Sequence, residues 1–126
     1  MASDKINFGR YGKTFQEGLV QLIFEDRSFA DQITEVLNIN FIELEYLRTF
    51  LRKTLNFRQK YDKHPSVDAM LTIIKTELEG EDEVVQQQVQ DYFTRMHTRD
   101  VTDAEYIKEI SLDFCRKQNL KEAMLT

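Results

Sequence analysis

The 126-residue sequence has few of the residues that make turns and cross-links: one proline, four glycines and one cysteine. So few turn residues, and no sustained apolar–polar alternation, argue against a β-rich fold. The single cysteine, Cys115, excludes an internal disulfide, and no stretch approaches the roughly 20 apolar residues of a membrane span. Because the sequence also has no signal-peptide pattern, we expect a reducing, aqueous compartment, the cytoplasm. Cys115 follows Phe114 on an apolar helix face, which predicts a buried structural thiol.

The charge of the chain is acidic, and this argues against a general nucleic-acid binder. The net charge is −5. Residues 1–63 carry ten Lys/Arg and nine Asp/Glu, whereas residues 64–126 carry seven Lys/Arg and thirteen Asp/Glu. The basic side chains of the first half lie mostly on one predicted helix, where a solvated face is the simpler interpretation and a site for phosphate or an acidic partner is the alternative. We expect no sequence-specific nucleic-acid contact and no membrane partner.

The motifs that carry chemistry are missing or incomplete. Gly12-Lys13-Thr14 resembles the end of a phosphate-binding loop, but the earlier glycine is replaced by Asn7 and no hydrophobic strand precedes it. His64 and His97 have no partners at metal-ligand spacing, so we interpret them as surface residues. No nucleophile–base grouping is suggested by spacing. We therefore assign no catalytic, cofactor-binding or metal-binding residue and expect a non-catalytic chain.

Apolar residues instead recur at helical spacing along most of the chain, which predicts an all-α bundle of about six helices. The expected ranges are 15–25, 28–37, 40–61, 67–78, 81–96 and 102–126. Predicted N-terminal caps are Thr14 with Glu17, Ser28 with Asp31, Ser66, and Thr102 with Glu105. The helix over 40–61 has two apolar stripes, one of leucines and one of aromatic residues, beside a basic arc. Neighbours must cover it from two sides, so we expect it to be the central helix.

The last two predicted helices have matched apolar seams and a short connection, which predicts an antiparallel helical hairpin. This divides the chain into a flexible leader (1–13), a globular helical head (14–80) and a hairpin (81–126). The final helix lacks an end signal, so we expect it to continue into a linker that is cut off. An exposed seam predicts two-fold self-association through the hairpin, whereas arms folded back on the core are the alternative. The predicted interface residues are Val85, Val89, Tyr92, Phe93, Met96, Ile107, Ile110 and Phe114.

Three stretches resemble the N-terminal domain of DnaB-type replicative DNA helicases, in a phage-like version. Residues 15–24 resemble the opening helix of that family, with its Leu-Gly pair reversed as Gly18-Leu19. Residues 40–50 are similar to its Asp-Phe-Tyr and His-Arg-x-Ile-Phe segment, without the histidine. Residues 63–68 are similar to its Gly-x-Pro-Ile-Asp turn, without the glycine. The resemblance spans about residues 14–124.

The resemblance implies a non-catalytic assembly domain. In that family a globular head is followed by a helical hairpin that pairs with the hairpin of a neighbouring subunit. The pairs form a collar on one face of the hexameric ring, and primase or a helicase loader docks on the collar. The full-length chain would then be an ATP-dependent DNA helicase in the cytoplasm of the host, if phage-encoded. A freestanding all-helical adaptor or regulator that binds a partner protein is the alternative.

Overall fold

The computed structural model describes residues 6–125, and helices are the only regular secondary structure in that range. This confirms the predicted all-α fold. The α-helices are α1 (Lys13–Glu25), α2 (Arg27–Ile33), α3 (Glu45–Tyr61), α4 (Val67–Thr76), α5 (Glu83–Met96) and α6 (Ala104–Leu125). Two short 3-10 helices, η1 (Phe8–Tyr11) and η2 (Ile39–Phe41), precede α1 and α3. Between residues 6 and 125 no helix combines the length and the apolar character that a membrane crossing requires.

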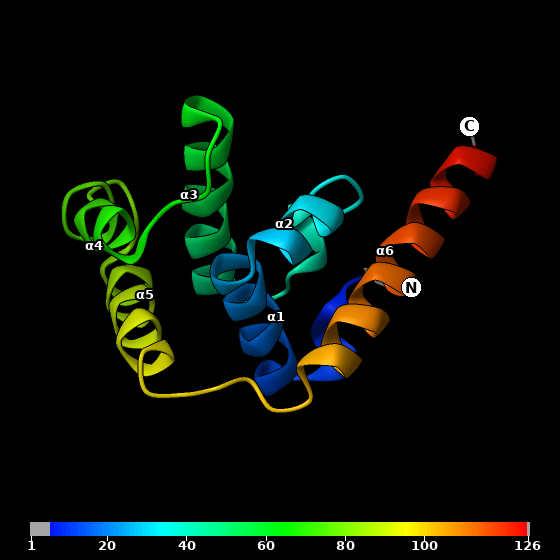
Figure 1. Ribbon diagram of the computed structural model, residues 1–126, viewed down its shortest axis with the longest axis horizontal. Coiled ribbons are helices and arrows are strands. Elements are labelled where there is room, and N and C mark those ends of the chain that lie inside the picture. The colour runs from blue at the N-terminus through cyan, green and yellow to red at the C-terminus, as the bar shows by residue number, and fades with distance from the viewer. Residues whose placement is uncertain (1–5, 126) are drawn as a thin grey trace.

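The centre of the molecule is α1, not the longer α3 that the sequence predicts. Nine consecutive residues of α1, from Gln16 to Phe24, are buried, and α1 packs against α2, α3, α6 and η1 (Figure 1). The C-terminal part of α3 instead reaches the surface, where Tyr61 is 54% exposed. The prediction failed because Gln16, Glu17 and Gln21 look like an exposed polar face of α1, although all three are buried.

Helices α5 and α6 do not form the predicted hairpin. They lie on opposite sides of α1, with α5 against α3 and α6 against α1 and α2 (Figure 1). The connection, residues 97–103, runs across α1 instead of turning back, because the Gln21 side chain donates hydrogen bonds to the backbone carbonyls of Met96 and Arg99. The two seams therefore face the core from different directions.

The helix starts confirm one predicted cap and correct three. Ser66 caps α4, its Oγ accepting from the N–H of Ala69 at 3.0 Å. Helix α1 begins before Thr14, at Lys13, and α6 begins after Thr102, at Ala104. Helix α2 is capped by Asp26, whose carboxylate accepts from the N–H of Phe29 at 3.1 Å. Asp26 lies two residues before the predicted cap, Ser28. It is the C-cap of α1 as well as the N-cap of α2, so the two helices meet in a single corner.

The N-terminal segment is part of the fold from Phe8 onward. Residues 1–5 of the predicted flexible leader lie outside the described residues. Phe8 is fully buried, and its ring lies 4.4 Å from that of Phe114, between centroids. Tyr11 and Phe15 stack beside it at 4.9 Å. The prediction of a loose leader is thus wrong for η1, because an aromatic residue can anchor a short segment that lacks helical periodicity.

Candidate functional site

The predicted interface residues are core residues within this chain. Seven of the eight are buried, and Ile110 is half-buried. Tyr92 and Phe93 pack against Phe50 of α3, with ring centroids 5.4 and 5.8 Å apart. Phe114 packs edge-on against Phe41 at 5.4 Å. The exposed seam that the sequence predicts is therefore absent, and a hairpin-to-hairpin contact through these residues would require the fold to open.

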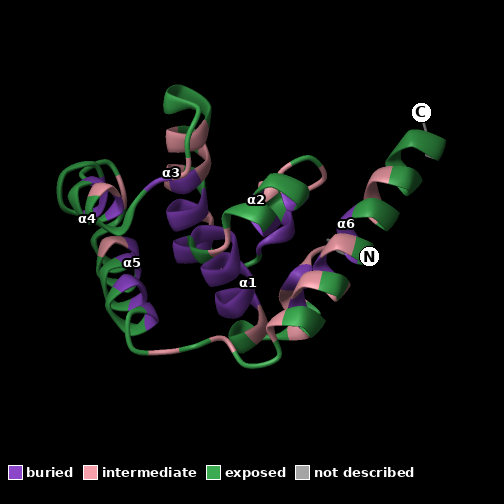
Figure 2. Cartoon of the chain, viewed as in Figure 1, coloured by how far each residue is buried: buried purple, intermediate pink, exposed green. Residues whose placement is uncertain are grey.

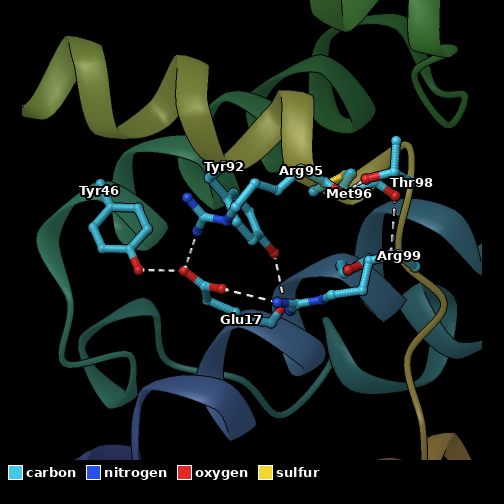
Figure 3. A network of polar contacts seen from close by, with 8 residues as sticks. Glu17, Tyr46, Tyr92, Arg95, Met96, Thr98 and Arg99 are labelled. Carbon is cyan, nitrogen blue, oxygen red and sulfur yellow. Dashed lines mark hydrogen bonds and ion pairs between the residues drawn. The ribbon is translucent and has the colours of Figure 1, made fainter.

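A buried carboxylate, Glu17 of α1, organises the polar contacts beneath α5 (Figure 3). Its Oε2 accepts from the hydroxyl of Tyr46 and from Nη2 of Arg95, both at 2.5 Å. Its Oε1 accepts from Nη1 of Arg99 at 3.4 Å, and its backbone carbonyl accepts from the hydroxyl of Tyr92 at 2.6 Å. One residue of α1 thereby holds α3, α5 and the connection to α6.

The negative charge of Glu17 is paired with two arginines, Arg95 and Arg99. The Glu17 side chain is only 4% exposed, whereas the Arg95 and Arg99 side chains retain 45% and 39% exposure. The guanidinium groups thus reach solvent while they neutralise the carboxylate. Burial, with a smaller effect of the Glu17 carboxylate, raises the pKa of Tyr46 and of Tyr92 above the usual tyrosine value. Both hydroxyls therefore stay protonated and act as donors, which suits a structural node better than a reactive one.

Sequence reasoning missed this node because Glu17 also fits the spacing of a capping box with Thr14. The available signal was the pair of arginines, Arg95 and Arg99, four residues apart near the end of a predicted helix. A second feature that it missed is the convergence of His64 and His97, which lie far apart in the sequence but line one cavity. Spacing cannot reveal such a convergence, because it depends on how α4 and α5 pack around α1.

The cysteine behaves as predicted. Cys115 is fully buried on the inner side of α6, and this burial raises the pKa of its thiol to about 12. A thiol with so high a pKa is almost entirely protonated at neutral pH and is a poor nucleophile.

The outer side of α6 carries three exposed apolar side chains. At about 100° per residue, Tyr106, Leu120 and Met124 fall on one side of the helix, opposite Cys115. They are 61%, 61% and 77% exposed, respectively. The C-terminal part of α6 extends away from the other helices (Figure 2). We define these three residues as the α6 stripe. The exposed Lys117–Asp113 ion pair lies on the same side between Tyr106 and Leu120, so the contiguous apolar part of the stripe is Leu120 with Met124. Exposed apolar side chains on a projecting helix are typical of a surface that contacts another protein.

Comparison with known proteins leaves the family open. No protein-family model, no curated protein and no solved structure matches this chain.

Proposed function

We propose that this chain is a non-catalytic assembly and docking domain of a DnaB-type replicative DNA helicase. In this role it would pair with a neighbouring subunit and hold a primase or a helicase loader beside the ring. The work of the domain would then be recognition, carried out by surfaces rather than by a reactive centre.

The observation that carries this proposal is the position of the three stretches that resemble the family. Residues 15–24 lie in α1 and residues 40–50 cover η2 and the start of α3; these two pack together through Phe24 and Phe50, with ring centroids 5.5 Å apart. Residues 63–68 join them where Nε2 of His64 contacts the Phe24 carbonyl at 2.5 Å. Three separate resembling stretches thus lie in one packed unit, which supports the proposal that they reflect a shared fold.

The α6 stripe is the surface that we assign to subunit pairing, in place of the buried seam. Burial of a large apolar side chain contributes roughly 1.5–3 kcal/mol. Leu120 and Met124, contributed by both copies of a two-fold contact, would supply four such side chains. Association costs several kcal/mol of translational and rotational entropy, so this burial is enough only for weak pairing of isolated domains.

Two measurements test this function. Sedimentation velocity across concentration should show reversible dimers, which Leu120→Ser with Met124→Ser should shift to monomers. The control is Lys121→Ser with Glu122→Ser, which changes two exposed residues of the same turns at equal net charge and should still pair.

The second measurement is binding of the immobilised chain to the primase and the helicase loader encoded by the same genome. A chain that stays monomeric at millimolar concentration and binds neither protein is not a collar domain.

A freestanding adaptor is the second candidate, and burial of the predicted interface favours it. With the seam in the core, the α6 stripe is still exposed, and it also suits a partner protein of another kind. Under this alternative the chain remains monomeric and the α6 stripe binds a different protein.

A further inference from the structure

A cavity of about 290 Å³ lies where the end of α1, the start of α4 and the end of α5 meet. Its apolar residues are Phe24, Pro65 and Met96, all buried, with Val67 at the rim. The remaining lining residues are Glu25, His64, Ser66 and His97, and no lysine or arginine is among them. The cavity thus combines an apolar floor with a polar rim that contains one carboxylate.

The two histidines serve as fixed walls of this cavity. Nη1 of Arg58, which can only donate, lies 2.7 Å from Nδ1 of His64, so Nδ1 accepts and Nε2–H donates to the Phe24 carbonyl. Nδ1 of His97 donates to the Phe93 carbonyl at 2.6 Å, and its ring stands edge-on to Phe93. Among the described residues no three His, Cys, Asp or Glu side chains converge as metal ligands, so the histidines do not make this a metal centre.

The carboxylate at the rim is not paired with a lysine or an arginine. Glu25 accepts one hydrogen bond, from Nε2 of Gln21 at 3.1 Å, and no Lys or Arg within residues 6–125 forms an ion pair with it. Partial burial raises the pKa of Glu25 and the neighbouring Asp100 carboxylate adds to this, against the lowering effects of the Gln21 hydrogen bond and of His97. An added cation would relieve both effects, because it would replace lost solvation and screen the like charge.

The apolar surface continues outward from the cavity along α4. Val67 and Leu71 are 47% and 39% exposed, and their spacing of four residues places them on the same face of the helix. A chain segment that enters the cavity from this side would lie across both side chains.

We propose that this cavity receives a lysine or arginine side chain from a partner protein whose neighbouring apolar residue packs on Val67 and Leu71. The methylene stem lies on Phe24, Pro65 and Met96, and the cationic head pairs with Glu25 at the rim. Long basic side chains bury their stems on apolar surface in this manner while the charge stays near water. This recognition site lies away from the α6 stripe and does not depend on the helicase assignment.

Titration of the ¹⁵N-labelled protein with N-acetylarginine amide, followed by NMR, tests the cavity. Backbone amide signals of Glu25, Ser66, Val67 and His97 should shift together and saturate. N-acetylcitrulline amide has almost the same shape without the charge, so it should bind about three- to fivefold more weakly, the size of one partly exposed ion pair. Equal affinity for the two compounds, or shifts spread over the acidic residues 77–83, overturns the proposal.

Two variants and one peptide complete the test. Glu25→Gln keeps a side chain able to contact Gln21 and should remove the preference for arginine over citrulline, whereas Glu79→Gln, which makes the same charge change outside the cavity, should keep it. An acetylated Arg-Ala-Ala-Leu amide should bind more tightly than the single amino acid, and Leu71→Ser should remove that gain only. A peptide that gains nothing over N-acetylarginine amide argues for a small-molecule ligand and contradicts a protein partner. Either failure would leave pairing and primase binding through other surfaces untouched, so the two proposals can fail separately.

Discussion

At the scale of single residues, Glu17 matters most because its carboxylate holds three parts of the chain at once. Removing a buried ion-pair partner is costly, since the groups left behind lose their compensation. Here the cost is reduced because Arg95 and Arg99 can turn to solvent, but the Tyr46 hydroxyl cannot. We predict that Glu17→Ala lowers the free energy of unfolding by roughly 2–4 kcal/mol.

Urea unfolding followed by circular dichroism measures this loss, provided that the slope with urea stays unchanged. Glu35→Ala, at an exposed position, should stay within about 0.5 kcal/mol of the parent. Glu17→Gln should fall between the two, since its amide still accepts from Tyr46 but presents N–H groups to the arginines. If Glu17→Ala unfolds at the same urea concentration as the parent, the network does not stabilise the fold.

The same residue marks what sequence patterns cannot resolve. A glutamate three residues after a threonine predicts a capping box from local spacing alone. The observed partners of Glu17 come from α3 and α5, tens of residues away. Local patterns therefore predicted where α1 lies, within two residues at its start, but not which of its faces is buried.

At the scale of helices, the close approach of α1 and α6 depends on Gly18. A Cβ added at Gly18 would lie 3.1 Å from Cδ1 of Ile107 and 3.3 Å from Cγ1 of Val101. We predict that Gly18→Ala changes stability by less than about 1 kcal/mol, because the gain in helix propensity offsets the tight contact. Gly18→Leu should destabilise by roughly 1–3 kcal/mol, because it overpacks the contact with α6.

Thermal unfolding measures the loss of stability in Gly18→Leu, and hydrogen exchange shows which helices lose protection. In Gly18→Leu, the amides of α6 should lose more protection than those of α5, which packs on α3. Gly80→Ala is the matched control, since nothing lies within 4 Å of its added Cβ, and it should be nearly neutral. Uniform loss of protection across all helices would show that Gly18 does not act through the α1–α6 contact.

The helices themselves were predictable, whereas their partners were not. The seams of α5 and α6 were identified correctly as apolar, and their burial follows from that character. An apolar stripe does not say which helix covers it, so a short connection between two stripes favoured a hairpin. The connection instead crosses α1, because Gln21 and Glu17 bind its backbone and Arg99. Polar residues of α1, which resemble a surface face, thus decide the arrangement of two apolar helices.

At the scale of the whole molecule, α6 is attached to the body partly through charge. Nζ of Lys108 donates to Oδ2 of Asp26 at 2.6 Å, at the corner between α1 and α2, and lies over the Phe29 ring. Further along α6, Nδ2 of Asn119 donates to the Val36 carbonyl at 3.1 Å. Since the apolar contacts of α6 are confined to its inner side, these polar contacts set where it lies on α1 and α2.

The Asp26–Lys108 pair should give the fold a component of stability that depends on pH. The hydrogen bond from Lys108, followed by that from the Phe29 N–H, lowers the pKa of Asp26, and the bond to Asp26 raises the pKa of Lys108. A carboxyl whose pKa is lowered on folding stabilises the fold at pH values above its unfolded-state pKa, near 3.8. This contribution is lost as the pH falls through the folded-state pKa. The contribution of Lys108 is present at pH values below its unfolded-state pKa of 10.5. It is lost as the pH rises through the folded-state pKa.

Asp26→Asn isolates the ion pair, because asparagine is also a good N-cap and can still accept from Phe29. We predict that it destabilises the fold by roughly 0.5–1 kcal/mol at pH 7 and low salt, the size of a partly exposed pair. The difference from the parent should shrink in 1 M salt. It should also decrease as the pH falls below 3.8 toward the lowered pKa of Asp26. Urea unfolding at pH 3, 5 and 7 measures this, with Glu122→Gln on exposed α6 surface as the control. A difference that persists unchanged at pH 3 would mean that Asp26 acts through its shape or its cap, and that α6 is held to the α1–α2 corner without help from charge.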